Sequence, residues 1–215
     1  MNKIPRMKIL VILAHPDKSS FSHAIAGTAV RALEENGHEV IYHDLYAERF
    51  SSTLTTAEIF KNSAVPRPVG KHCAELAAAE GIIIVHPNWW GQPPAILKGY
   101  IDRVFRPGVA YEFAEGDDGE GIPIGLLKAT AALVFNTSNT ELEREKEVFG
   151  DPLQSIWKKC VFDLCGVKTF PAYPLTVCTQ VCYSISNGGS HKWTNILYHS
   201  SINSSLMITL ALNGL

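Results

Sequence analysis

Residues 7–14 constrain the fold most, because they form an almost unbroken apolar run, Met7-Lys8-Ile9-Leu10-Val11-Ile12-Leu13-Ala14, that ends abruptly in polar residues. A continuous apolar run of this length indicates a strand buried on both faces, as in a parallel sheet. Ser19, Ser20 and Ser22 follow this strand, where the next helix begins. Backbone N–H groups at a helix start favour an anion such as phosphate, although an ordinary helix cap would use the same hydroxyls.

The same alternation of strand and helix patterns continues along the chain. Further strands are expected at residues 39–42, 81–86, 130–135 and 167–170. Helices are expected at residues 24–36, 71–80, 95–105, 141–149 and 152–164, with a helical turn at 56–60 and a solvated excursion at 114–125. This pattern predicts an α/β fold with a five-stranded parallel sheet of order 2-1-3-4-5. Such a sheet binds ligands where the loops beyond its strand ends diverge.

Three loops would meet at that edge of the sheet. The serine-rich loop offers N–H and O–H donors, and the aromatic loop at residues 87–94 offers Trp89 and Trp90 as flat surfaces. Residues 136–140 offer polar groups that could bond the edge of a planar ring. Together these groups suit a flavin nucleotide, but packing tryptophans and a plain turn are the alternatives. We expect one tryptophan to be structural and the other to line the site.

Composition limits the partners and the compartment. The chain has 215 residues and a net charge of -2, without the basic stripe that nucleic-acid binding requires. Five cysteines lie scattered through apolar segments, which indicates a reduced, cytoplasmic protein and not a disulfide framework. The first apolar run is too short to cross a membrane, so no membrane insertion is expected.

The last part of the chain differs in character. Residues 174–215 contain no Asp or Glu and a single basic residue, Lys192. We therefore divide the chain into a domain at residues 1–173 and an atypical uncharged tail at 174–215. Cys178, Cys182, His191 and His199 lie in this tail, but their spacing matches no strong zinc pattern, so no metal site is predicted.

Several motifs resemble those of the flavodoxin-like NAD(P)H:quinone reductases, most of all the shorter bacterial members, which include ancillary oxidoreductase subunits of potassium-efflux systems. The most specific is the ungapped stretch at residues 87–105, followed by Ala110-Tyr111. Leu13-Ala14-His15-Pro16 with Ser19-Ser20-Phe21-Ser22, and the later stretches at 136–140, 149–153 and 164–167, also match. The resemblance covers about residues 7–173 and implies a flavodoxin-like three-layer sandwich.

The resemblance also implies roles for particular residues. On the phosphate side of the flavin it places His15, Ser20, Phe21 and Ser22. Beside the isoalloxazine ring it places Pro87, Asn88, Trp89 and Trp90. At the pyrimidine edge of the ring it places Asn136, Thr137, Ser138 and Asn139. Tyr111 would lie over the substrate side as a catalytic residue, often contributed across a homodimer interface.

The implied activity is that of an NAD(P)H dehydrogenase (quinone). NAD(P)H would pass a hydride to the N5 atom of FAD or FMN, and a quinone-like acceptor would then take two electrons from the same place, in ping-pong order. A nitro- or azoreductase, a flavodoxin-type electron carrier and a flavin-binding regulatory subunit of a transporter are the alternatives.

Two features depart from the family pattern. Mammalian members carry a Tyr and a His beyond the third loop, whereas residues 141–149 contain neither, and Phe149 takes the His position. Family members also end in a charged helix, unlike the uncharged tail of this chain.

Overall fold

The computed structural model describes residues 6–60, 63–114, 121, 123–140, 142–167 and 181–182. Apart from Val181 and Cys182, the predicted tail at residues 174–215 therefore lies outside the described residues.

A parallel sheet forms the centre of the molecule, as the apolar runs predict. Its four long strands are β1 (Lys8–Leu13), β2 (Glu39–Asp44), β3 (Gly81–Pro87) and β6 (Ala131–Ser138), in the spatial order β2-β1-β3-β6. The two residues of β7 (Val181–Cys182) pair in parallel with the end of β6. Each long strand is therefore followed by a connection that returns over the sheet, as parallel pairing demands.

The fifth strand predicted at residues 167–170 is not observed at Val167, and the other three residues lie outside the described residues. Val167 is instead used to close the preceding helix. Its N–H donates to the carbonyl oxygen of Phe162 (3.0 Å), just after Gly166 takes a positive φ of 79°. A glycine in the left-handed region commonly ends a helix in this way.

Helices occur near the positions that the sequence predicts. They are α1 (Phe21–Glu35), α2 (Arg67–Ala78), α3 (Ala95–Val104), α4 (Leu142–Phe149) and α5 (Pro152–Ser155), which continues into the π-helix η2 (Ile156–Asp163). A short 3₁₀ helix, η1 (Thr56–Glu58), lies within the helical turn predicted at residues 56–60. None of the helices in the described ranges is long and apolar enough to cross a membrane.

A small hairpin occupies part of the predicted excursion at residues 114–125. Its strands are β4 (Tyr111–Glu112) and β5 (Ile124–Gly125), which pair antiparallel. Gly125 makes this arrangement possible, because a Cβ atom there would lie 2.3 Å from the backbone of Cys165 at the end of η2.

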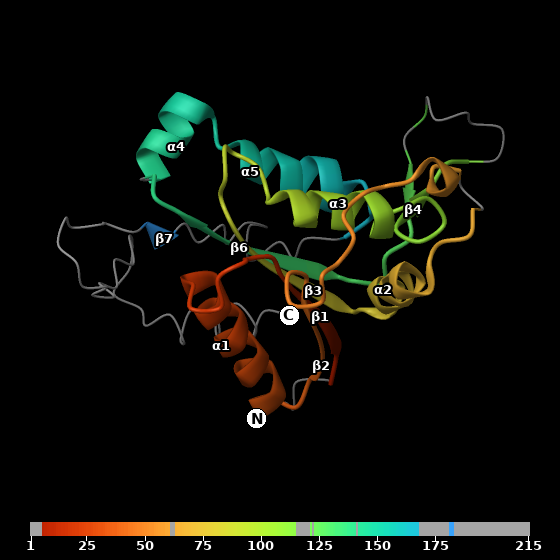
Figure 1. The fold of residues 1–215 in the computed structure, drawn as a ribbon, viewed down its shortest axis with the longest axis horizontal. Coiled ribbons are helices and arrows are strands. Elements are labelled where there is room, and N and C mark those ends of the chain that lie inside the picture. Colours follow the sequence, from red (N-terminus) through yellow and green to blue (C-terminus); the bar gives the residue numbers. More distant parts are fainter. Residues whose placement is uncertain are drawn as a thin grey trace.

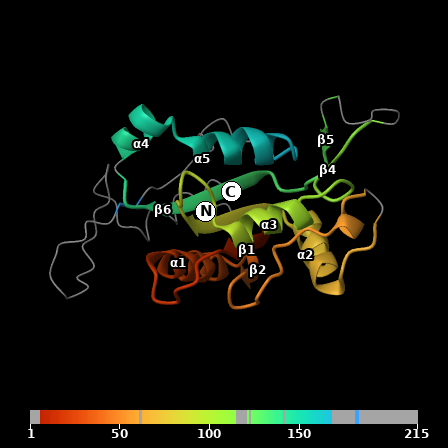
Figure 2. The same ribbon diagram turned by 45° about the horizontal axis from the view of Figure 1, so that its top comes forward.

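Alternating side chains of each strand enter two different cores. Leu10 and Ile12 point to the face that packs against α2, α3, α5 and η2, whereas Ile9, Val11 and Leu13 point to the face covered by α1. Figure 1 and Figure 2 show α1 on one side of the sheet and α5 on the other, and Figure 1 shows α3 on the same side as α5. Both faces are apolar, which explains why the strands read as continuous apolar runs.

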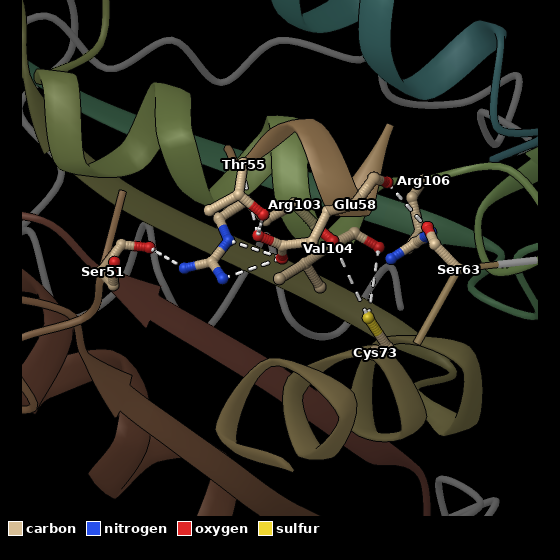
Figure 3. Close-up of polar contacts among 8 residues, drawn as sticks. All are labelled: Ser51, Thr55, Glu58, Ser63, Cys73, Arg103, Val104 and Arg106. Carbon is tan, nitrogen blue, oxygen red and sulfur yellow. Dashed lines mark hydrogen bonds and ion pairs between the residues drawn. The ribbon is translucent and has the colours of Figure 1, made fainter. Parts of the chain in front are cut away.

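A buried ion pair fastens the segment after β2 onto α3 (Figure 3). Arg103 donates from Nε and Nη2 to Oε1 of Glu58 (3.0 and 2.8 Å). Burial alone would raise the pKa of the Glu58 carboxyl, but hydrogen bonds from Thr55 and Arg103 outweigh it and lower the pKa. Gly99 allows close contact, since a Cβ there would fall 2.1 Å from the Ser52 carbonyl oxygen.

Candidate functional site

Three loops meet at the carboxyl edge of the sheet, as predicted from the strand order. The Oγ atom of Ser22 and Oγ1 of Thr137 lie 3.2 Å apart, and the N–H of Asn88 donates to the Thr137 carbonyl oxygen (2.7 Å). The rings of His15 and Trp89 have centroids 6.1 Å apart. Residues separated by more than 100 positions in the sequence therefore form one continuous site.

The first loop leads into the amino end of α1, a 15-residue helix without an acidic residue in its first turn. Ser20 caps this helix, and its Oγ is also 3.0 Å from Nδ1 of His23. The other ring nitrogen of His23 lies 3.1 Å from Oδ2 of Asp44, at the end of β2. Ser20 therefore has a structural role, while the helix dipole still favours an anion at this end. Phe21 is partly buried against the hydrophobic core between α1 and the sheet.

His15 lies half-buried between the first loop and the aromatic loop. Its Nδ1 is within hydrogen-bonding distance of both the backbone N–H and the carbonyl of Asp17 (3.1 and 3.2 Å). Burial is the main cause that lowers the pKa of His15, and His23 adds to the effect. His15 is therefore held mostly as the neutral imidazole at pH 7, with its ring beside Trp89.

Asn88 and its neighbours close the aromatic loop. Oδ1 of Asn88 accepts from the N–H of Gly91 (2.9 Å), and Nδ2 donates to Oε1 of Glu145 on α4 (3.2 Å). The backbones of Trp89 and Gln92 exchange two hydrogen bonds (3.1 and 3.0 Å). The side chain of Asn88 is thus occupied in shaping the loop and joining it to α4.

The prediction that one of the two tryptophans is structural is wrong. Trp89 is 42% exposed and Trp90 is fully exposed. Trp90 takes a φ of 58°, in the left-handed region, which turns its ring outward from the tight loop. Both rings are therefore available for contacts beyond this chain.

Residues 136–138 form the end of β6 and not a loop, which corrects the sequence reading. Asn136 and Thr137 pair with His86 and Pro87 of β3, and Asn136, Thr137 and Ser138 are all buried. The Ser138 hydroxyl accepts from the N–H of Thr140 (3.0 Å), and Asn139 is exposed. The turn therefore begins three residues later than their polar character suggested.

His86 was missed as a site residue. Its Nδ1 lies 2.8 Å from the carbonyl oxygen of Pro87, and its Nε2 accepts from Nε1 of Trp157 on η2 (2.9 Å). Burial lowers the pKa of His86 to about 4, so the ring is neutral at pH 7 and Nδ1 carries the proton. His86 thereby fixes the start of the aromatic loop. A histidine at the end of an apolar strand could have been noticed in the sequence. Its hydrogen-bond partner, 71 residues away, could not have been identified from the sequence alone.

Tyr111 is not brought to the three loops within one chain. It lies in β4, at the end of the molecule opposite α4, which follows the carboxyl end of β6 (Figure 1). Its half-buried ring packs beside Phe113, with ring centroids 5.8 Å apart. Burial raises the pKa of the Tyr111 hydroxyl, which is therefore protonated at neutral pH.

The chain's own features fit a flavin nucleotide at this edge. Half-exposed Trp89 provides a flat apolar surface beside His15, and the start of α1 provides a positive helix end for a phosphate. The turn at Asn139 lies beside them, because β6 pairs with β3 and Thr137 contacts both Ser22 and Asn88.

Comparisons with known proteins agree with this geometry. A family model described as a flavodoxin-like fold matches residues 7–179. An uncharacterized NAD(P)H oxidoreductase of Haemophilus influenzae is 34% identical over 166 residues, which cover 75% of this chain and 80% of that protein. NAD(P)H dehydrogenase [quinone] 1 of Cavia porcellus is 32% identical, with 88% of this chain and 73% of that protein covered.

A solved structure is also similar. NAD(P)H:quinone oxidoreductase from Methanothermobacter marburgensis superimposes with a TM-score of 0.61 and 26% identity, over 71% of this chain and 76% of that one. The parallel sheet, the three loops at its carboxyl edge and these matches lead to one conclusion: the chain belongs to the flavodoxin-like family that contains these NAD(P)H oxidoreductases.

Proposed function

We propose that the protein is a flavin-dependent NAD(P)H:quinone oxidoreductase. The observation that carries this proposal is the meeting of the three loops, with Thr137 in contact with both Ser22 and Asn88. The names of the relatives from Cavia porcellus and Methanothermobacter marburgensis support the same reaction. When bound, FAD or FMN supplies the chemistry of accepting and donating a hydride.

The residues of the chain would bind and orient that group. His15, Ser20, Phe21 and Ser22 surround its phosphate side, where the start of α1 attracts negative charge. Pro87, Asn88, Trp89 and Trp90 border the ring, and Trp89 carries most of the stacking because it is the one beside His15. The polar edge of the ring meets the end of β6, where Asn139 is exposed and Asn136, Thr137 and Ser138 lie buried beneath it, and donors at this end would stabilise negative charge developing there.

A homodimer would complete the site. Tyr111 lies far from the loops of its own chain, so its proposed position over the substrate requires a second copy. Asn88 joins the aromatic loop to α4, and α4 carries exposed Val148 and Phe149, while Trp90 on the loop is fully exposed. Exposed apolar side chains at one edge favour contact with another protein surface.

Three finer points belong to the same proposal. The sheet has the five-strand order 2-1-3-4-5, supported by the pairing of β7 beside β6. The flavin-binding domain ends near residue 173 and the uncharged tail follows, although the family match extends to residue 179 and β7 lies within the tail. The protein works in the cytoplasm, which is supported by Cys73, Cys160 and Cys165 being free thiols.

The visible absorption spectrum of the purified protein, loaded with FMN or FAD, tests the proposal. Addition of NADPH or NADH without oxygen should bleach the flavin bands, and a soluble quinone should restore them. Bleaching that no quinone reverses would contradict the quinone reductase activity. A protein that takes up neither flavin would contradict the flavin site itself.

Subunit mixing tests the role of Tyr111 in the dimer. Trp89→Ala and Tyr111→Phe should each lower turnover, and the co-expressed heterodimer of the two variants should recover one intact site. Recovery to about half of the wild-type rate is expected if Tyr111 acts across the interface. No recovery in an isolated heterodimer would show that it does not.

A further inference from the structure

A second polar cluster lies away from the three loops, between β2 and α2. The β2–α2 cluster consists of His43 near the end of β2, Glu48 in the following turn, and His72 and Glu75 on α2. Both histidines are buried, whereas the side chain of Glu48 is 36% exposed. The flavin proposal uses none of these residues.

The two imidazoles converge on one carboxylate. Nδ1 of His43 lies 2.8 Å from Oε1 of Glu48, and Nε2 of His72 lies 3.5 Å from Oε2. Ligand atoms of the three residues all lie within 4.8 Å of one another. In a tetrahedral zinc site with zinc–ligand distances of about 2.0–2.1 Å, the ligand atoms lie about 3.3 Å from one another. The ligand atoms of these three residues therefore need only small side-chain movements to share one zinc ion.

Glu75 occupies the position of an outer-shell residue. Its Oε2 lies 3.0 Å from Nε2 of His43, on the side of the ring opposite Glu48. Carboxylates that hold the other nitrogen of a metal-binding histidine orient the ring and raise its basicity. A proton on Nε2 that is donated to Glu75 leaves the lone pair of Nδ1 directed at Glu48.

Two carboxylates, those of Glu48 and Glu75, flank the imidazole of His43. Both nitrogens of His43 lie beside carboxylate oxygens, Nδ1 at 2.8 Å from Glu48 and Nε2 at 3.0 Å from Glu75. A single divalent ion would balance the two carboxylates of Glu48 and Glu75.

The cluster is also incomplete as a network of hydrogen bonds. The 3.5 Å separation of His72 and Glu48 exceeds the usual range for an N–H···O bond. His72 Nδ1 and the hydroxyl of fully buried Tyr100 have no hydrogen-bond partner within the described ranges. The rings of His72 and Tyr100 pack edge to face, with centroids 5.5 Å apart.

The turn that carries Glu48 is organised in advance. Oδ1 of Asp44 accepts from the N–H groups of Tyr46 and Ala47, and the Glu48 N–H donates to the Asp44 carbonyl (2.9 Å). Two ligands thus come from β2 and its turn, and a third comes from α2. Pre-organised ligands on rigid elements favour metal binding, because little ordering remains to be done.

We propose that His43, Glu48 and His72 bind a zinc-class divalent cation, with Glu75 as its outer-shell partner. Two imidazoles and one carboxylate suit Zn²⁺ better than Mg²⁺ or Ca²⁺, which prefer oxygen ligands alone. Three protein ligands leave one position for water. The ion would tie the turn after β2 to α2, on the core side of the sheet.

Zinc binding by the full chain tests this site without reference to flavin or turnover. After treatment with EDTA and buffer exchange, Zn²⁺ is titrated in competition with a chromophoric chelator. We expect one equivalent to bind. Glu48→Gln and His72→Gln should each weaken binding at least 100-fold, and Glu75→Gln about 10–100-fold. His38→Gln, a buried histidine outside the β2–α2 cluster, should bind as wild type.

Two further measurements keep the result unambiguous. Co²⁺ in place of Zn²⁺ should give visible bands that are lost in Glu48→Gln, a variant whose half-exposed side chain leaves the fold intact. The Cys178→Ser/Cys182→Ser double variant should bind as wild type, which excludes the two cysteines of the tail as the source. Failure of the wild-type chain to bind Zn²⁺, or unchanged affinity in Glu48→Gln and His72→Gln, would overturn the proposal.

Discussion

The two halves of the continuous motif at residues 87–105 differ in the exposure of their key side chains: those of the first half are exposed and those of the second half are buried. In the first half, Trp89 and Trp90 stand exposed at the carboxyl edge of the sheet. In the second half, Tyr100 and Arg103 are buried, and Arg103 pairs with Glu58 (Figure 3). A motif of this kind can therefore be specific for two reasons at once. Its first half shapes a site, and its second half holds the segment after β2 in place.

Substitution of Arg103, in the buried half, should lower the free energy of unfolding more than any other substitution proposed below. Arg103→Met leaves the Glu58 carboxylate buried without its partner, which costs about 3–5 kcal/mol of the free energy of unfolding. Urea denaturation measures the loss. Flavin affinity, measured below the unfolding transition, should stay within twofold of wild type.

The matched control removes both charges. The Arg103→Met/Glu58→Leu double variant should recover most of that stability, since well-packed apolar residues replace buried ion pairs at little cost. A double variant as unstable as Arg103→Met would show that packing of the arginine stem, and not the unpaired charge, causes the loss.

His86 joins the start of the exposed half to Trp157 on η2, so its substitution should affect both stability and the site. His86→Leu leaves the buried N–H of Trp157 without an acceptor, at a cost of about 1–3 kcal/mol at pH 7. It also frees the Pro87 carbonyl at the start of the aromatic loop, so flavin binding should weaken. Trp157→Phe in the same chain should restore stability but not flavin affinity.

The pH dependence of stability, compared between wild type and His86→Leu, tests the neutral state of His86. Burial lowers the pKa of His86 from 6.5 to about 4, so the unfolded chain takes up the proton first as the pH falls. Above pH 6.5 the ring is neutral in both the folded and the unfolded chain, so the free energy of unfolding keeps its full value. Between pH 6.5 and pH 4 only the unfolded chain is protonated, and the free energy of unfolding falls by about 3 kcal/mol. Wild type should therefore lose stability faster than His86→Leu over that window, and parallel curves would refute the assignment.

Trp89 tests the exposed half, with a smaller effect confined to binding. Trp89→Ala removes a half-exposed ring, so the free energy of unfolding should change by less than about 0.5 kcal/mol. Loss of one stacking contact, about 1 kcal/mol, should weaken flavin binding about fivefold in a fluorescence titration. Phe60→Ala, an exposed aromatic residue away from the three loops, should leave affinity unchanged, and equal effects of both variants would exclude stacking.

The sequence predicts the sheet better than it predicts the site. Continuous apolar runs identify β1, β3 and most of β6, because both faces of these strands are buried. The polar residues Asn136, Thr137 and Ser138 hide the end of β6, since their pairing with β3 and their burial are tertiary effects. The partner of His86 was likewise hidden, because only packing of η2 on the sheet brings Trp157 to it.

Trp90 gives the smallest effect on folding and the sharpest test of the exposed half. Its φ of 58° and full exposure mean that Trp90→Gly relieves backbone strain while adding flexibility to the unfolded chain, so stability should change by less than about 0.5 kcal/mol. If the ring meets a second copy, the dimer should dissociate at concentrations where wild type does not, as light scattering would detect. Turnover per protomer should then fall on dilution, because Tyr111 would no longer reach the loops of its partner. A Trp90→Gly variant that stays dimeric and loses flavin instead would assign the ring to the cofactor.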